Sequence, residues 1–354
     1  MRILDRYLAW AVMSGTLLTL AGLLPLMGVF ILSDELDAIG TERYGLTEAL
    51  LFTLLSLPRY LYQLFPIATL IGALIGLGTL ASRSELVAMR AAGISVGQLV
   101  RAALLGGLVL ATVAVILGEL VAPIAEQRGV ELRRQALSGE VAQLTPYGFW
   151  AIDEGAYVNI REIRSGTSLR DIYIYRVDAA RGTLEASHAE GARYEDGRWR
   201  LEGISLSRVD GEGVKVERVE QAEWDSMLDP GLLKVVVADP RALPVWGLYK
   251  YIRFMSVNKQ DASAYEIAFW GKVLHPVLTL SMILIAIPML LGSSRSTGMG
   301  RRMLAGILVG LVYYLVSRTF AYLALLFGMN AFLAAIAPPV LFIGAAMLLL
   351  RRVG

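Results

Sequence analysis

The chain has 354 residues, of which 56% are hydrophobic and 18% are charged, against roughly 45–50% and 25% in an ordinary soluble domain. Its formal net charge of +2 is too near balance for the concentrated basic stripe of a nucleic-acid-binding surface. The sequence contains no cysteine, which excludes disulfides and thiolate chemistry, and only two histidines, which argues against a multi-histidine metal centre.

The first apolar segment is long enough to cross a bilayer. Residues 10–32 contain no charged side chain, and at about 1.5 Å per residue such a helix exceeds a hydrocarbon core of about 30 Å. The run is too long for a signal peptide and ends at Ser33-Asp34-Glu35 without a small-x-small cleavage site, so we expect an uncleaved helix. Five similar stretches occupy residues 61–81, 102–122, 273–291, 303–327 and 331–350. The sequence therefore predicts six transmembrane helices.

The distribution of arginine predicts the orientation of these helices, because basic flanks of transmembrane segments stay in the cytoplasm. Both ends of the chain, the loop after the second span and the loop after the fourth span carry Arg2, Arg6, Arg83, Arg90, Arg101, Arg295, Arg301, Arg302, Arg351 and Arg352. The first loop is instead mainly acidic. We therefore expect both termini in the cytoplasm and residues 123–265 outside it.

Residues 123–265 differ in kind from the rest of the chain, since they hold 41 of the 64 Asp, Glu, Lys and Arg residues. After a charged, helix-compatible stretch, short runs of β-branched and aromatic residues typical of strands occupy 149–152, 157–160 and 172–175. Asp196-Gly197 suits a hairpin turn, and the run after it has an imperfect period of two. These features predict a sandwich, a jelly roll or a half-barrel.

The expected fold is an α-helical integral membrane protein of six transmembrane helices, with an all-β domain of jelly-roll type inserted between helices three and four. Residues 1–122 would hold the first three helices, together with a short cytoplasmic helix at about 83–94. Residues 123–265 would form the inserted domain with its helical connections, and residues 266–354 the last three helices.

The short polar segment between the second and third spans is a candidate docking element. Ser82 or Ser84 can cap the start of a helix there, and Gly93 can end it. On that helix Leu86, Met89 and Gly93 share one face, which Glu85 flanks. Two interpretations are open at this point: a turn that lies on the membrane surface, or a contact for a soluble partner.

Other positions in the spans have specific requirements. Gly306 and Gly310, at four-residue spacing, allow close helix approach, either within the chain or with another subunit. The charge of Arg318 is costly in hydrocarbon, so Arg318 should face the protein interior, a polar cavity or an anionic head group. Glu119, near the outer end of the third span, is a candidate partner for it.

Arg133 and Arg134 lie beyond the third span, at the expected outer surface of the membrane. They form either a solvated helix face or a contact for phosphates, for which arginine supplies a planar fork of donors.

The sequence contains no recognisable catalytic motif. Gly271-Lys272 lacks the upstream glycine and the following hydroxyl of an ATP-binding P-loop. His188 accompanies no hydrolase motif and is interpreted as an ordinary strand or turn residue. We therefore expect no enzyme activity, no bound cofactor and no metal, and energy for any uphill transport would come from another subunit.

Six spans interrupted by a β-rich insertion resemble the permeases of lipopolysaccharide-export ABC transporters, the LptF/LptG family, over essentially the whole chain. The most specific match is residues 83–93, which resemble the cytoplasmic coupling helix of that family. Further matches are Ile3-Leu4-Asp5-Arg6-Tyr7, Phe65-Pro66, Gly118-Glu119-Leu120-Val121-Ala122-Pro123 and Trp270-Gly271-Lys272-Val273-Leu274-His275-Pro276. The N-terminal run and the coupling-helix segment are more similar to the LptG branch than to the LptF branch.

This resemblance implies several partners. Permeases similar to this chain work as a heterodimer of LptF and LptG, bound to two copies of the ATPase LptB and to the single-span protein LptC. The residues expected in the ATPase contact are Arg83, Glu85, Leu86 and Met89. Spans one and five would line the openings to the partner permease, which would give Gly306 and Gly310 a use.

The resemblance also implies a cavity for a lipid with acyl chains and phosphates, which needs an apolar lining and a basic rim. The expected contributors are Phe65, Arg133, Arg134 and Arg318. Some relatives carry lysines at the outer end of span one, whereas residues 31–37 here are Ile-Leu-Ser-Asp-Glu-Leu-Asp, so no phosphate contact is expected from them. The inserted jelly roll would pass lipid to the next jelly roll through strand addition at its edge.

The expected function is extraction of lipopolysaccharide from the outer leaflet of the inner membrane of a Gram-negative bacterium, driven by ATP hydrolysis in the LptB subunit. The lipid would pass to a periplasmic jelly-roll bridge toward the outer membrane. One alternative is a membrane scaffold or mechanical transmitter whose β domain only binds partners, and another is the LptF-type half of the permease. A membrane-embedded hydrolase is disfavoured, because Glu119, Lys272, His275 and Arg318 are a poor supply of acids, bases and ligands.

Overall fold

The computed structural model describes residues 3–41, 43–137, 143–153, 156–165, 167–178, 183–195, 197–210, 213–224, 226, 243–257, 260–291 and 299–353. The chain divides into two compact units. The helical unit comprises Met1–Arg133, Pro244–Tyr249 and Ser263–Gly354, and the β unit comprises Arg134–Leu243 and Lys250–Ala262.

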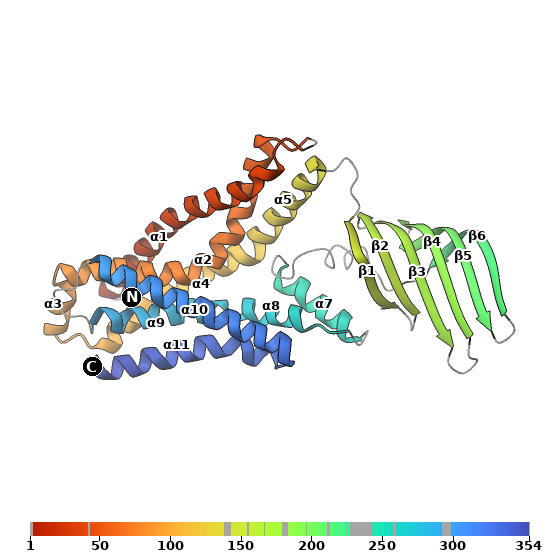
Figure 1. Cartoon of the computed structure of the whole chain (residues 1–354). Helices are drawn as coiled ribbons and strands as arrows, with labels where there is room; N and C mark the ends of the chain where they lie inside the picture. Colours follow the sequence, from red (N-terminus) through yellow and green to blue (C-terminus); the bar gives the residue numbers. More distant parts are fainter. Residues whose placement is uncertain are drawn as a thin grey trace. The chain divides into compact units, whose positions relative to one another are not determined.

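Long helices make up the helical unit (Figure 1). In chain order the helical elements are α1 (Ile3–Glu35), η1 (Leu36–Ala38), α2 (Leu46–Ser82), α3 (Glu85–Ala91), α4 (Val96–Ile116), η2 (Leu117–Val121), α5 (Ala122–Leu137), α7 (Val245–Val257), α8 (Ser263–Val273), α9 (His275–Leu291), α10 (Met299–Phe327) and α11 (Ala331–Val353). Five helical stretches are long and apolar enough to cross a membrane, and α8 with α9, bent by 52° at their break, make a sixth. Among the described residues, five or six helical stretches can therefore cross a membrane, and the predicted number of six is reached if α8 and α9 form one broken span.

The backbones of α1 and α2 lie in contact because glycines remove the side chains between them. A methyl group at Gly72 would overlap the α1 backbone at Thr16, and one at Gly76 would overlap Ala11. Gly15 faces Gly72 from the α1 side. Small residues at such crossings bring helices close enough for extensive van der Waals contact, which drives helix association in lipid.

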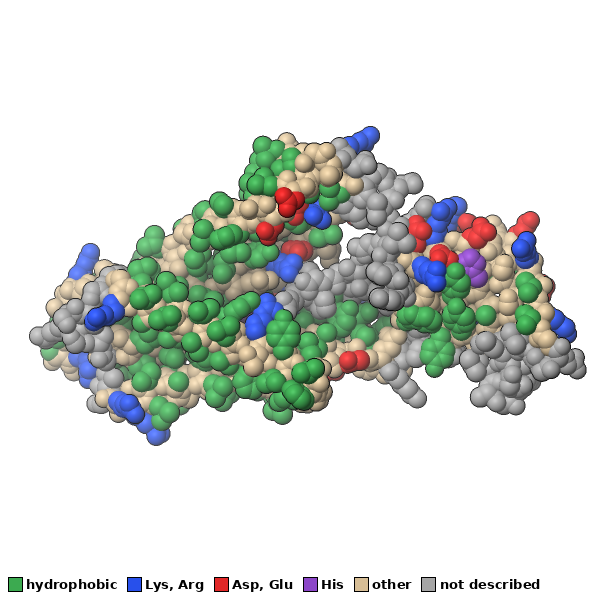
Figure 2. Space-filling model, viewed as in Figure 1, with side chains coloured by type: hydrophobic (Ala, Val, Ile, Leu, Met, Phe, Trp, Pro, Cys, Tyr) green, Lys and Arg blue, Asp and Glu red, His purple; other side chains and the backbone are tan. Residues whose placement is uncertain are grey.

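Apolar residues fill the interior of the helical unit and also cover its outside. The core includes Leu8, Val12, Phe65, Leu70, Leu74, Leu99, Leu110, Met282, Ile283 and Ile287. Exposed apolar residues on α10 are Leu304, Ile307, Leu308, Leu311, Val312 and Leu315, and Figure 2 shows hydrophobic side chains over the surface of the unit. An apolar exterior of this extent is typical of helices that face lipid or another membrane helix.

The described strands of the β unit form one antiparallel sheet in the order β1 to β6. They are β1 (Gln143–Asp153), β2 (Ala156–Ser165), β3 (Ser168–Asp178), β4 (Thr183–Glu195), β5 (Arg198–Asp210) and β6 (Gly213–Trp224). Glu195 pairs with Arg198 across Gly197, whose φ of 84° fits the predicted hairpin turn. The all-β domain is confirmed, and the up-and-down order of these strands fits the half-barrel among the predicted alternatives.

In this sheet the regular alternation of buried and exposed side chains is interrupted at one place in each of four neighbouring strands, along a line that crosses the sheet. Buried members of one hydrophobic cluster stand three positions apart in four strands: Ile160 and Ile163, Leu169 and Ile172, Ala189 and Ala192, and Leu201 and Ile204. An odd separation turns a side chain to the other face of a regular strand. Asp171 (φ 53°) in β3 and Gly203 (φ 64°) in β5 have left-handed backbones at this line, which return the next buried side chain to the core in these two strands. The imperfect period of two in the sequence has this cause.

We predict that Gly72→Ala destabilises the helical unit, because the added methyl group meets α1 backbone rather than a flexible side chain. Overpacking of this kind costs on the order of 1–3 kcal/mol, so the melting temperature in detergent should fall. The matched control is Gly22→Ala in α1, where a methyl group would meet nothing within 4 Å. Equal melting temperatures for the two variants would contradict the close backbone contact.

Candidate functional site

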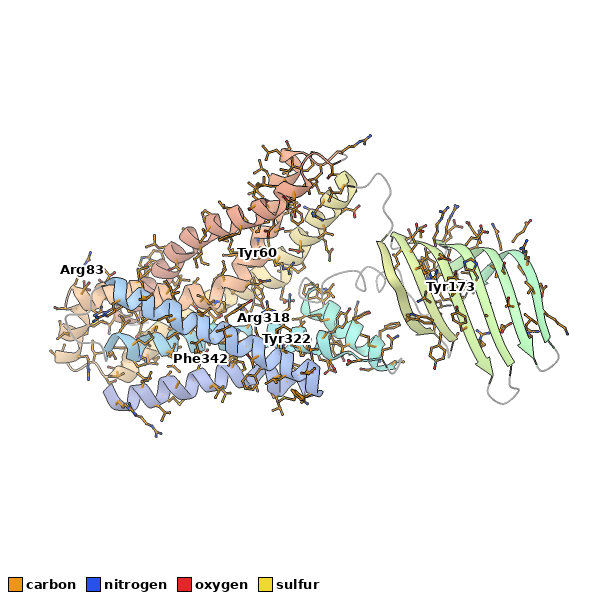
Figure 3. All side chains as sticks on the ribbon, in the orientation of Figure 1. Tyr60, Arg83, Tyr173, Arg318, Tyr322 and Phe342 are labelled. Carbon is orange, nitrogen blue, oxygen red and sulfur yellow. The ribbon has the colours of Figure 1, made fainter. Side chains whose placement is uncertain are left out.

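The short helix α3 lies at the end of the helical unit that also holds both ends of the chain (Figure 1). Left-handed backbone delimits it on both sides, at Ser84 (φ 62°) and Gly93 (φ 89°). Arg83 follows the last residue of α2 and its side chain is exposed (Figure 3). A short helix is thus present where the sequence predicts a docking element.

The two apolar residues of the expected docking face point into the helical unit instead. Leu86 is 6% exposed and shares a core with Leu8 and Leu99, and Met89 packs against this core. Leu86 thus anchors α3 in the bundle and is not available to another protein, whereas Met89 is only partly buried and its expected contact with another protein stays a prediction. The exposed side chains of the segment include those of Arg83, Val87, Ala88, Arg90 and Ala91.

Glu85 is tied to the first helix of the chain. The hydroxyl of Tyr7 in α1 donates a hydrogen bond to Oε2 of Glu85 at 2.7 Å. A second tie lies close by in the sequence, where Arg101 of α4 donates to Asp5 of α1 at 2.9 Å. Any displacement of α3 is therefore opposed by a direct polar contact with α1.

Arg133 is held by an acidic residue of α1. Its Nε donates to Oε2 of Glu35 at 2.8 Å, and the hydroxyl of Tyr44 donates to the same oxygen at 2.8 Å. The guanidinium carbon lies 5.7 Å from the centre of the Phe52 ring, which places the cation near an aromatic face. The side chain of Arg134 lies outside the described residues. The expected basic rim is thus represented by one arginine that already has a carboxylate partner.

Tyr44 is a permanent donor in this cluster. Burial, with the hydrogen bond to Glu35 as the second cause, raises the pKa of its phenol from 10 to about 12. A folded-state pKa above the unfolded value stabilises the fold at lower pH and is lost as the pH rises through about 12. The contact with Glu35 therefore persists through the whole physiological range.

Three other expected site features differ in the structure. Phe65 is 2% exposed within the helix core, so it does not line an open cavity. The expected pairing of Arg318 with Glu119 is wrong, since Nε of Arg318 donates to the hydroxyl of Tyr314 at 3.2 Å and Glu119 instead pairs with Lys272. The guanidinium carbon of Arg318 also lies 5.3 Å from the centre of the Tyr314 ring, so both the hydroxyl and the ring of Tyr314 interact with this cation.

The glycine pair of α10 faces α2 of the same chain. A methyl group at Gly306 would meet Leu74 at 2.5 Å, and one at Gly310 would meet Ile67 at 3.1 Å. The structure thus supports the intrachain alternative for this pair and corrects the expectation of a contact with a partner permease.

A polar hollow on the β unit is internally paired. Its lining residues are Glu162, Arg170, Asp171, His188, Glu190, Gly191 and Glu202. Nε2 of His188 lies 2.8 Å from Oδ1 of Asp171, while Arg161 lies 3.7 Å from the other oxygen. The Tyr173 ring lies 4.5 Å from the His188 ring, and burial raises the pKa of its phenol (Figure 3). His188 is thus a residue of β4, and among the described residues no group of three or more His, Cys, Asp and Glu could hold a metal ion.

Sequence reasoning did not find the partners of Glu85 and Glu119. Tyr7 is 78 positions from Glu85, and Lys272 is 153 positions from Glu119. Such separations leave no trace in helical periodicity. The available signal was that these partners occur in the same sequence segments, 3–7 and 270–276, that carry the family resemblance.

The apolar helices, the short helix at one end of the bundle and the inserted antiparallel sheet define a multi-span membrane protein with a β domain. The family model for the lipopolysaccharide export system permease LptF/LptG matches residues 6–352. The permease protein LptG of Haemophilus influenzae is 34% identical over 351 residues, covering 99% of this chain and 98% of the relative. LptG of Escherichia coli K12 is 32% identical over 353 residues, with the same coverage. The chain belongs to the LptF/LptG family of lipopolysaccharide export permeases.

We predict that Tyr7→Phe loosens α3, because the variant loses the donor to Glu85 but keeps the ring. The lost hydrogen bond is one of the polar contacts that hold α3 against α1, so amide hydrogens of Glu85–Ala91 should exchange faster. The control is Tyr322→Phe in α10, whose side chain is 64% exposed. Unchanged exchange in Tyr7→Phe would mean that the hydrogen bond does not restrain α3.

Proposed function

We propose that this chain is the LptG-type half of an ABC transporter that extracts lipopolysaccharide from the outer leaflet of the inner membrane. The lipid passes to a bridge of periplasmic β domains, and ATP hydrolysis in a separate LptB-like subunit drives the transfer. The observation that carries the ATPase partnership is α3, which is fixed to the bundle through Leu86 while Arg83, Val87 and Arg90 remain exposed. A helix that is anchored on one side and free on the other suits the transmission of force from a soluble subunit.

The orientation proposed for the chain puts both termini and α3 in the cytoplasm and the β unit in the periplasm. Arginines at the α3 end include Arg83, Arg101, Arg302 and Arg351, and blue side chains gather at this end in Figure 2. Basic flanks stay cytoplasmic during membrane insertion.

The proposed partners are an LptF-like permease, an LptB-like ATPase dimer and an LptC-like single-span protein. The exposed apolar residues of α1 and α10 offer surfaces for another membrane helix or for acyl chains. The chain itself would bind no cofactor and act as a transport subunit, with ATP used by its partner.

The lipid path proposed for this subunit follows the outer half of α1. Val29 is 65% exposed and Phe30 is 57% exposed there, whereas Phe65 is buried. Arg133 and Arg318 are the cations proposed to meet lipid phosphates, and both are only partly buried. This assignment replaces Phe65 as the expected apolar contact.

We predict that Glu85→Ala weakens binding of the LptB-like ATPase by about tenfold, equivalent to about 1.4 kcal/mol, or decouples ATP hydrolysis from lipid release. The reason is the loss of a carboxylate beside the exposed face of α3. Co-purification from membranes and ATPase assays of the assembled complex measure the two effects.

Two controls separate the roles of Glu85. Tyr7→Phe removes the hydrogen bond within the chain but keeps the carboxylate, so its effect should be smaller. Asp37→Asn changes an exposed acid of η1 and should leave the ATPase bound. Normal assembly and normal export in Glu85→Ala would overturn the proposed role of α3.

We predict that a photoreactive residue at Phe30 forms an adduct with lipopolysaccharide, whereas the same residue at Leu17 does not. Both positions are on α1 and similarly exposed, at 57% and 55%, but they differ in depth by about 20 Å along the helix. Cargo taken from the outer leaflet should reach Phe30 alone. A scaffold that moves no lipid would give no adduct at either position.

A further inference from the structure

Glu119 lies where the third span departs from regular α-helix. The five residues Leu117–Val121 form a π-helical turn, η2, between α4 and α5. Turns of this kind are rare, and they occur frequently at functional sites. The carboxylate of Glu119 has no part in the docking element or in the proposed lipid path.

One carboxylate joins three segments of the chain at this point. Oε1 of Glu119 lies 3.2 Å from Nζ of Lys272 in the last turn of α8, and Oε2 accepts a hydrogen bond from the backbone N–H of Val245 at 2.6 Å. Nζ of Lys272 also donates to the carbonyl oxygen of Gly118 at 3.3 Å and lies 5.7 Å from the centre of the Tyr62 ring. The pair has a buried cation, an acid with both oxygens used, and a nearby aromatic face.

Because the Glu119–Lys272 pair is buried, loss of either partner would leave an unpaired charge at a high cost in free energy. The side chains of Lys272 and Glu119 are 8% and 14% exposed. A charge in such surroundings depends on its partner, because water cannot replace the partner in a membrane-embedded bundle. The two groups should therefore stay together when the helices that carry them move.

The three segments are those that connect the helical unit with the rest of the chain. The chain leaves the helical unit after Arg133, a short distance along the helix that begins at η2, and it returns at Pro244, immediately before Val245. Lys272 stands just before the 52° bend between α8 and α9. Glu119 thus links the outgoing connection, the returning connection and the broken span.

Two other ion pairs on the same helix make different links. Glu126 pairs with Arg59 of α2, and Arg133 pairs with Glu35 of α1. They follow Glu119 at seven-residue intervals and so lie along one side of the helix. These pairs fasten the outgoing helix alone, whereas Glu119 also holds the returning chain and α8.

We propose that Glu119 is a positioning residue that couples movement of the broken span to both connections of the β unit. This inference rests on the proposed transport function. When α8 and α9 change their mutual angle, Lys272 shifts Glu119, and Glu119 moves the start of α7 together with η2. The β unit then follows the state of the membrane helices.

The test uses the full chain in its complex with the second permease and the ATPase, reconstituted in proteoliposomes. Glu119→Gln removes the charge but keeps an oxygen for the N–H of Val245, and Lys272→Met removes the cation. Each variant is assayed for ATP hydrolysis and for lipopolysaccharide delivered per ATP. Spin labels on α2 and on β5 report the distribution of distances between the two units.

We expect ATP hydrolysis within twofold of the unaltered complex, at least a fivefold fall in lipid delivered per ATP, and a broadened distance distribution in both variants. Glu126→Gln is the matched control on the same helix and should change none of these by more than twofold. The reversed pair, Glu119→Lys with Lys272→Glu, should recover part of the coupling, since it restores the ion pair but not the acceptor for Val245.

The outcomes distinguish this inference from the function on which it rests. If the unaltered complex delivers no lipopolysaccharide, the proposed function fails. The spin-label distances still test whether Glu119 couples the broken span to the connections of the β unit. Unchanged distances and unchanged delivery per ATP in Glu119→Gln would overturn the coupling role. Failure of both single variants to assemble, with normal assembly of Glu126→Gln, would also overturn it and leave Glu119 as a residue of folding alone.

Discussion

Lipid offers no hydrogen-bond partners, so every polar group inside a membrane-spanning bundle must find its partner within the protein. This constraint explains the pattern of contacts in the helical unit. The hydroxyls of Thr16, Thr53 and Thr279 each donate to the backbone carbonyl four residues earlier. The buried acid Glu119 finds a cation and an N–H, and the charge of Arg318 finds a phenol. The fold supplies partners for these groups, whereas the buried Nδ1 of His275 has no hydrogen-bond partner among the described residues.

α1 connects the two ends of the unit through this same constraint. Near its start Tyr7 contacts the short helix α3, and at its end Glu35 contacts Arg133. Between these points α1 crosses α2 at glycines, so the two backbones are in direct contact without flexible side chains between them. α1 therefore joins the α3 end of the unit to the Arg133 end, with directional polar contacts at both of its ends.

The extent to which the sequence predicted this structure depended on the range of each interaction. The spans followed from the length of apolar runs. The end of α3 followed from Gly93, whereas Ser84 at its start makes no side-chain capping hydrogen bond. Leu201 and Ile204 broke the period of two because the backbone at Gly203 turns left-handed. Only the three-dimensional sheet shows that buried residues in four neighbouring strands share this three-residue spacing. The docking role expected for Leu86 was wrong because sequence cannot tell an outward face from an inward one on a seven-residue helix. The partners of Glu85 and Glu119 depend on tertiary contacts between distant segments.

The acidic residue at the end of α1 affects how Arg133 can bind a phosphate. Glu35 is the last residue of α1, and a carboxylate there would repel a lipid phosphate. It contacts Nε of Arg133, however, and a guanidinium has further N–H donors on its two terminal nitrogens. The Arg133 side chain is 40% exposed, so those donors are within reach of a ligand while Glu35 and Tyr44 fix the orientation of the fork. In the proposed transport role, Glu35 weakens the attraction of Arg133 for a phosphate and also fixes the direction from which the phosphate can bind. A weaker, directional contact favours release of the lipid within one transport cycle.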